Sequence, residues 1–312
     1  MLFTSPGPIF FSWGGITIRW YGLLIALALI LGTWVCQRVV QVRFSQKWEG
    51  EWAWIASHTA LQRPYWLAVV PQRCKYWGEI ADRVGDLVFW LVAGALPGAR
   101  AYYVAFKWEN YQDVWSTVNF GGLNFSVPAA LAIWEGGIAI HGAILGGFLA
   151  LLLFSWRYRL HWVTLADGIA PALILGQAIG RWGNFFNSEA FGAPTDLPWK
   201  LYIAPQYRPP QYANYDYFHP TFLYESLWNF GVFMLLLSVL VKYPRAKDGT
   251  LALLYVVFYS LGRIWIEGLR TDSLMLGSFR IAQLVSLVAI GAGLWGLQRL
   301  YGGVRQLKRA QS

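Results

Sequence analysis

The chain has 312 residues, of which 56% are hydrophobic and only 13% are charged, whereas soluble domains carry about 25% charged residues. Its net charge of +9 does not indicate nucleic-acid binding, because the basic residues flank apolar runs and form no basic polar patch. With 19 Trp and 17 Tyr available for two membrane interfaces, this composition predicts an all-α integral membrane protein with one domain over residues 1–312.

Seven apolar segments are long enough to cross a bilayer as helices, which takes about 20 residues each. The expected spans are 17–40, 84–106, 136–156, 163–185, 221–242, 249–269 and 279–300. The positive-inside rule assigns to the cytoplasm the flanks richest in Lys and Arg, which are 38–83, 157–162, 242–248 and 299–312. The bundle is therefore expected to begin outside the cell and to end in the cytoplasm.

Two connections are long. Residues 45–83 are expected to form a Trp-rich, basic cytoplasmic loop, and residues 187–220 an ordered loop on the outer face, between the fourth and fifth spans. The two cysteines, Cys36 and Cys74, belong to no metal-binding or disulfide pattern.

Polar side chains interrupt the first three spans, and charges inside spans usually face a cavity or a partner. Tyr21 lies at the outer end of the first span, where an ordinary interfacial aromatic is the alternative interpretation. Arg100 lies in the second span, at about the depth of the other polar residues, in the outer half or the middle of the bilayer. His141 lies well inside the third span, where an imidazole is either a satisfied structural group or a general base.

The fourth span ends in the stretch GRWGNFFNSEAFG (180–192), which is unusually polar for a membrane helix. Arg181 and Asn184 are three residues apart and share a helix face, and Glu189 continues the cluster onto the loop. Arginine binds phosphate with a rigid fork of donors, so this cluster is a candidate anion site. For Asp167, near the other end of the span, a helix-start or packing role is favoured.

The sixth span contains YSLGRIWIEGLR (259–270), in which Tyr259, Arg263, Glu267 and Arg270 form one helical stripe. The Arg263–Glu267 pair is either a structural ion pair or an anion-binding face whose arginine is held by its glutamate. Because these polar groups lie in the outer half or the middle of their spans, a cavity open to lipid that binds a phospholipid headgroup is expected.

Motifs spread over most of the chain resemble the bacterial phosphatidylglycerol–prolipoprotein diacylglyceryl transferase family, in the family's order. They are IRWYGLL (18–24), IHGAILGG (140–147), DGIAPALILGQAIGRWGNFFNSEAFG (167–192), HPTFLYES (219–226) and YSLGRIWIEGLRTD (259–272). The 180–192 stretch is similar to the family signature. The 45–83 segment is longer than expected for the family and matches none of its motifs.

The resemblance implies a seven-span enzyme that moves the diacylglyceryl group of phosphatidylglycerol onto the lipobox cysteine thiol of a preprolipoprotein. A thioether forms and glycerol 1-phosphate leaves, with no metal and no other cofactor. The implied partners are phosphatidylglycerol, the preprolipoprotein signal peptide and the bilayer. The implied location is the bacterial inner membrane, with the active site toward the periplasmic side.

The residues that match family positions receive roles from the same resemblance. His141 is the candidate base, Arg181 is assigned to the headgroup phosphate, and Arg263 to the leaving phosphate or the thiolate. An arginine that lowers the thiol pKa is the alternative to a histidine base. The expected substrate-binding residues are Tyr21, Arg100, Asn184, Glu189, Gly192 and Glu267. Arg100 is included only because of its expected depth in the membrane.

Two other function classes also need intramembrane arginines. A transporter or flippase for an anionic lipid is disfavoured because the sequence contains no visible inverted repeat. A noncatalytic lipid-binding scaffold would explain the arginines but not the presence of His141 and Glu189. The sequence therefore favours the transferase.

Overall fold

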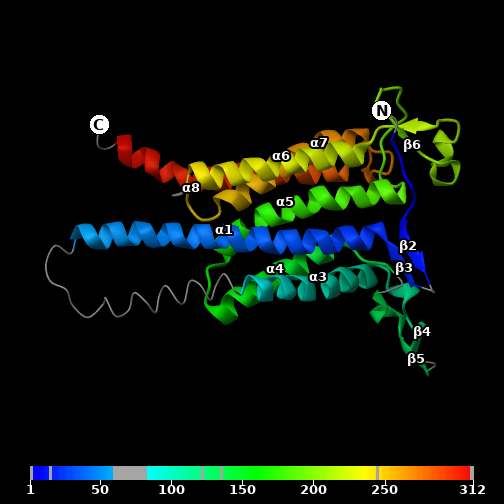
Figure 1. Ribbon diagram of the computed structural model, residues 1–312, viewed down its shortest axis with the longest axis horizontal. Coiled ribbons are helices and arrows are strands. Elements are labelled where there is room, and N and C mark those ends of the chain that lie inside the picture. The colour runs from blue at the N-terminus through cyan, green and yellow to red at the C-terminus, as the bar shows by residue number, and fades with distance from the viewer. Residues whose placement is uncertain are drawn as a thin grey trace. The chain divides into compact units, whose positions relative to one another are not determined.

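The structure is a computed structural model that describes residues 3–13, 16–58, 83–120, 123–133, 136–243 and 246–309 (Figure 1). It is mostly helical, as predicted, and seven helices of this described part are long and apolar enough to cross a membrane. The chain is thus a multi-pass membrane protein. The seven helices are α1 (Trp20–His58), α3 (Val84–Phe106), α4 (Ile140–Tyr158), α5 (Trp162–Asn187), α6 (Thr221–Lys242), α7 (Thr250–Leu269) and α8 (Ile281–Arg309).

The expected spans and the observed apolar helices differ by four residues at most at either end. The largest correction concerns α1, whose apolar part is Trp20–Arg43 but whose helix continues to His58. Residues 45–58 were expected in a loop, yet they contain no proline and are rich in helix-forming residues, so the helix continues. The rest of that expected loop, 59–82, lies outside the described residues.

The chain divides into two compact units, residues 78–162 and the remainder. In the smaller unit α3 and α4 lie side by side and antiparallel (Figure 1). A Cβ added at Gly94 would meet the Ala150 Cβ at 2.6 Å, and Gly98 and Gly142 are in equally close contact. Small residues let helix backbones approach in this way. The connection between the helices contains η2 (Trp108–Asn110), β4 (Trp115–Phe120), β5 (Leu123–Pro128) and η3 (Ala129–Leu131).

The larger unit has a core to which α1, α5, α6 and α7 all contribute. Val39, Ile174, Leu236 and Leu251 are among its fully buried members. Many large apolar side chains on the helix surfaces are exposed, including Leu287 and Val288 on α8. Such surfaces suit contact with lipid, since helices satisfy their backbone polar groups internally.

A buried ion pair ties α1 to α5 and α7 at one end of this unit. Arg43 Nη2 lies 2.7 Å from Asp167 Oδ2, and both side chains are almost inaccessible. The Asp167 carboxylate also accepts hydrogen bonds from the backbone N–H groups of Gly249 and Ala252, each at 2.9 Å. Asp167 therefore has the helix-start role favoured from sequence, but for α7 and not for its own helix.

A small, ordered cap covers the other end of the same unit. Its sheet contains β1 (Phe3–Thr4), β6 (Leu201–Tyr202) and β7 (Tyr217–Phe218) in that order, with β1 parallel to β6 and β6 antiparallel to β7. Phe185, Phe191, Phe218 and Phe222 form part of an aromatic core beneath it. The 187–220 segment is thus an ordered loop, as expected, and fixes the end of α5 against the start of α6. The remaining elements of this unit among the described residues are β2 (Ile9–Trp13), β3 (Ile16–Arg19), η5 (Pro205–Tyr207), η6 (Pro210–Tyr212), β8 (Met275–Leu276) and β9 (Phe279–Arg280).

Candidate active site

Two arginines and two glutamates from α5, α6 and α7 form a connected network beside the aromatic cap. One carboxylate oxygen of Glu225 lies 2.9 Å from Arg181 Nη2, and the other lies 3.5 Å from Arg263 Nη1. Arg263 also pairs with Glu267, one helical turn along α7, at 2.6 Å. We call Arg181, Glu225, Arg263 and Glu267 the arginine–glutamate network.

Exposure within the network is uneven. The side chains of Glu225 and Glu267 are 4% and 3% exposed, whereas those of Arg181 and Arg263 are 23% and 19% exposed. The carboxylates therefore lie behind the guanidinium groups and hold them, and each guanidinium keeps an accessible surface. Buried charges persist only when they are paired, so the glutamates can keep two arginines in an apolar bundle.

A second series of contacts, from residues at the C-terminal end of α5 and just after it, holds Arg181 in place. Arg181 Nη1 lies 3.4 Å from the Asn184 side-chain oxygen, and Asn184 donates to Glu189 at 2.9 Å. Asn187 also points its amide at Glu189, at 3.4 Å. Glu189 thus reaches Arg181 through Asn184, while the substrate-binding roles expected of Asn184 and Glu189 stay predictions.

Tyr21 and Gly192 are placed by close packing. A Cβ on Gly183 would collide with the ring of Tyr21, so this tyrosine lies directly against α5 at Gly183, and its expected substrate contact stays a prediction. A Cβ on Gly192 would lie 2.7 Å from the His219 Cβ. Gly192 therefore permits the crossing of two backbone segments, and its expected substrate contact stays a prediction.

A further ion pair extends the charges beyond α7. Arg270 holds Asp272 with two parallel hydrogen bonds of 2.9 and 2.8 Å. Burial opposes ionisation of both groups, but their mutual hydrogen bonds and attraction outweigh it. The pKa of Arg270 is consequently raised and that of Asp272 lowered. The charges of Glu225 and Glu267 contribute to the raised pKa of Arg270, so this pair is electrostatically part of the same site.

The histidine nearest in sequence to Glu225, His219, belongs to the same unit as the network. The Trp199 ring N–H donates to the Tyr224 hydroxyl oxygen at 2.9 Å, and that hydroxyl lies 3.3 Å from His219 Nδ1. Tyr224 can therefore donate to a neutral imidazole. Burial lowers the pKa of His219, which favours the same neutral form.

The other two expected site residues, Arg100 and His141, belong to the smaller unit. Arg100 is 4% exposed and donates to the carbonyl oxygens of Ala129 at 2.5 Å, Ala130 at 2.9 Å and Gly137 at 2.9 Å, as well as that of Gly136. Its guanidinium is thus occupied by the segment before α4. This anchoring explains Arg100 without a lipid ligand, and its expected lipid contact stays a prediction.

His141 differs from Arg100 because it is exposed, at the start of α4. Its ring stacks on Tyr102 of α3, with centroids 5.8 Å apart. An exposed imidazole is accessible to a substrate, and its role as base stays a prediction.

Sequence reasoning assigned no role to Glu225, which proves to be the centre of the network. Its side chain is the one that contacts both arginines. The available signal was a carboxylate five residues into an apolar span, within the motif HPTFLYES. A charge at that position requires a partner, but the partner cannot be identified without the packing of three helices.

Four arginines of the described residues fall into two groups by their partners. Arg43 and Arg100 are almost fully buried and donate largely to backbone carbonyls. Arg181 and Arg263 are partly exposed and are held by side-chain carboxylates and Asn184. The second arrangement leaves positive charge accessible to an anion, and two such groups on one carboxylate suit a phosphate.

Comparison with known proteins gives one family. A family model described as prolipoprotein diacylglyceryl transferase matches residues 8–299. A phosphatidylglycerol–prolipoprotein diacylglyceryl transferase of Acaryochloris marina is 52% identical over 96% of this chain and 93% of its own length. Proteins of the same name from Thermosynechococcus vestitus and Trichormus variabilis are 52% and 50% identical, over 96% and 98% of this chain and 94% of their own lengths.

Proposed function

Because the chain belongs to the prolipoprotein diacylglyceryl transferase family, we propose that Arg181 and Arg263 bind the phosphate of phosphatidylglycerol during the transfer. The chain is a transferase that moves a diacylglyceryl group from phosphatidylglycerol to a prolipoprotein. The single observation that carries the site assignment is the pair of partly exposed guanidinium groups held on one buried carboxylate.

The acceptor in this proposal is the lipobox cysteine of the prolipoprotein signal peptide. Its sulfur forms a bond to the glycerol carbon that carries the phosphate, and the bond between that carbon and the phosphate oxygen breaks. Glycerol 1-phosphate leaves with the electron pair of the broken bond, and the thiol proton passes to a base. The product is a thioether.

Negative charge grows on the phosphate oxygen as the carbon–oxygen bond breaks. Guanidinium groups that are already oriented stabilise this charge without reorganising, and one such donor contributes about 3–4 kcal/mol in well-studied sites. Arg181 is assigned to the headgroup phosphate and Arg263 to the leaving oxygen or the thiolate. Glu225 and Glu267 are positioning residues, since they hold the arginines from the buried side.

The base that takes the thiol proton is proposed to be His141. Its exposure supports this assignment, because a base must reach the proton that it removes. The alternative is that an arginine lowers the thiol pKa and solvent takes the proton. A severe loss of turnover in His141→Ala, relieved at high pH where the thiol ionises without help, supports the histidine; near-normal turnover at neutral pH favours the arginine.

The membrane topology completes the proposal. The flanks rich in Lys and Arg are assigned to the cytoplasm, which places the arginine–glutamate network and the cap on the periplasmic side of the inner membrane. A lipobox thiol emerging from the translocation machinery would meet the lipid headgroup there.

The experiment is a transfer assay with the purified full-length chain, phosphatidylglycerol and a synthetic lipobox peptide, read by mass spectrometry. The wild type is expected to give the diacylglyceryl thioether and glycerol phosphate. Arg181→Ala and Arg263→Ala are expected to lose at least a hundredfold in turnover while keeping the fold. Arg157→Gln, which changes an exposed arginine at the end of α4, is the matched control. Normal turnover in both alanine variants would refute the assigned roles.

A further inference from the structure

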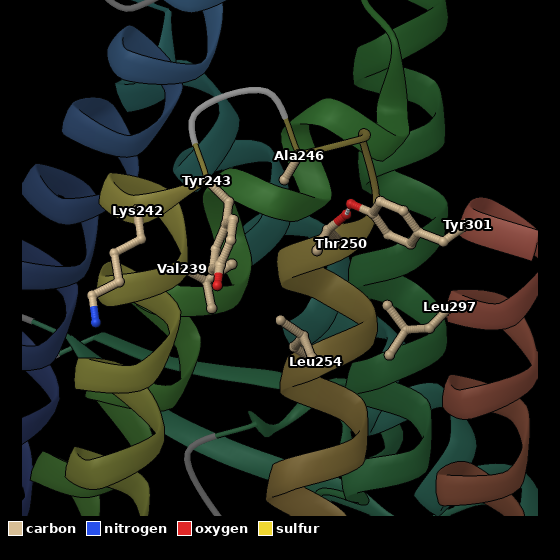
Figure 2. A pocket seen from close by; sticks show the side chains of 8 residues that line it. All are labelled: Val239, Lys242, Tyr243, Ala246, Thr250, Leu254, Leu297 and Tyr301. Atoms are coloured by element: carbon tan, nitrogen blue, oxygen red, sulfur yellow. Dashed lines mark hydrogen bonds between the residues drawn. The ribbon is translucent and has the colours of Figure 1, made fainter. Parts of the chain in front are cut away.

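A groove lies at the ends of α6, α7 and α8 that are remote from the arginine–glutamate network (Figure 2). It encloses about 930 Å³, within the size range of ligand sites. Its walls come from apolar side chains of three helices, among them Val239, Leu254 and Leu297. The groove is therefore separate from the transfer site and large enough for a hydrocarbon chain.

The hydroxyl groups in its wall are already satisfied. The Lys247 backbone N–H donates to the Tyr301 hydroxyl at 3.0 Å, and the Thr250 hydroxyl donates to the Lys247 carbonyl at 2.6 Å. Tyr301 and Thr250 oxygens lie 2.8 Å apart, so the Tyr301 hydroxyl donates to Thr250 and closes a ring of three bonds. The wall thus offers a ligand little beyond apolar surface, and its shape is fixed without a ligand.

The polar groups left for a ligand lie at the edge. Lys242 and Tyr243 line the groove at the end of α6 and are exposed, and Figure 2 shows the Tyr243 ring between α6 and α7. Among the described residues, neither the Lys242 ammonium nor the Tyr243 hydroxyl has a hydrogen-bonding or ionic partner. An unpaired cation beside apolar walls matches an amphiphile with a negative head.

Nearby charges favour an anion further. The Lys247 ammonium lies 5.7 Å from the centroid of the Tyr301 ring, which lines the groove, and donates to the Leu300 carbonyl at 2.6 Å. The one acidic side chain of the α6–α7 connection, Asp248, accepts a hydrogen bond from Thr164. Basic pockets between membrane helices at a bilayer surface bind anionic lipid headgroups.

We propose that this groove binds one anionic phospholipid of the adjacent leaflet, with an acyl chain over Leu254 and Leu297 and its phosphate beside Lys242. Tyr243 and Tyr301 lie at the ends of the apolar segments Thr221–Lys242 and Ile281–Gly302, where amphipathic aromatics mark the bilayer surface, so the lipid would enter sideways from its own leaflet. The lysine stem can follow the apolar wall while its ammonium stays at the headgroup level. This lipid is bound and not consumed.

The test is native mass spectrometry of the full-length chain in detergent, titrated with dioleoyl-phosphatidic acid or, in parallel, with dioleoyl-phosphatidylcholine. All variants are made in a background that carries both Arg181→Ala and Arg263→Ala, so that phosphate binding by these two arginines at the transfer site does not contribute. Lys242→Gln is expected to weaken binding of phosphatidic acid about fivefold, the effect of one basic residue at a membrane surface. Leu254→Trp, which fills the groove, is expected to remove the bound lipid.

Two controls make the outcomes decisive. Arg157→Gln removes a basic residue at another helix end and is expected to bind phosphatidic acid as its parent does. Lys242 is exposed, so its change leaves the fold intact, which circular dichroism checks. Equal binding of the two lipids by the parent, or equal affinity of the parent and Lys242→Gln for phosphatidic acid, would overturn the proposal. This test measures lipid binding and not turnover, so its result does not depend on the result of the transfer assay.

Discussion

Replacing Glu225 with glutamine tests how the network is held together. The change keeps the size of the side chain but removes the charge that contacts Arg181 at 2.9 Å and Arg263 at 3.5 Å. Breaking a buried ion pair from one side costs about 3–5 kcal/mol. Both arginines are partly exposed and reach some water, and Arg263 keeps Glu267, so we expect the lower end, about 3 kcal/mol of unfolding free energy.

The effect on transfer should be distinct from the effect on stability. Without Glu225 the two guanidinium groups repel each other across the site and lose their common orientation. We expect kcat to fall roughly a hundredfold, comparable to the loss of one preorganised donor. KM for phosphatidylglycerol should not rise, because the site gains net positive charge and still attracts the anionic lipid.

The assay is steady-state transfer to a lipobox peptide over a range of phosphatidylglycerol concentrations, with thermal unfolding of the same samples. Glu225→Asp keeps the charge on a shorter arm and should recover part of kcat. Asn229→Ala, on the same buried face of α6, controls for a general weakening of the helix. A Glu225→Gln enzyme with kcat within twofold of the wild type would refute the argument that this carboxylate positions both arginines.

Further predictions concern the guanidinium geometry of Arg181, the packing at Gly192 and the stability of the protein at acidic pH. Arg181→Lys keeps the charge but loses the two-pronged geometry, so transfer should fall about tenfold, less than in Arg181→Ala. Gly192→Ala places a Cβ 2.7 Å from that of His219, and differential scanning calorimetry should show a loss of about 1–3 kcal/mol. The lowered pKa of Asp272 adds stability that is fully present above its unfolded pKa near 3.8 and is lost as pH falls through the folded pKa. Asp272→Asn should therefore remove part of the acid-induced drop in melting temperature, and an unchanged pH profile would contradict that contribution.

Features set by local pattern could be predicted from the sequence. The spans follow from runs of apolar residues, and their ends were located to within four residues. The Arg263–Glu267 pair follows from helical spacing alone, because side chains four residues apart share a face. The ordered state of the 187–220 loop was also expected.

Features set by packing between helices could not be predicted. Glu225 lies in a motif that had been noticed, but its contacts with α5 and α7 depend on the relative rotation of three helices. Asp167 was expected near a helix start, yet the helix that it caps lies about 80 residues further along the chain. The surroundings of Arg100 could not be predicted either, because sequence shows the charge and not the carbonyl groups of the segment before α4 that accept its hydrogen bonds.

The most direct measurement of the central claim is an electron-microscopy structure of the full-length chain in a phosphatidylglycerol-containing nanodisc. The account predicts lipid phosphate oxygens within about 3 Å of a guanidinium nitrogen of Arg181 or Arg263, with Glu225 behind both. A well-resolved headgroup bound elsewhere, with both arginines contacting only their glutamates, would contradict it.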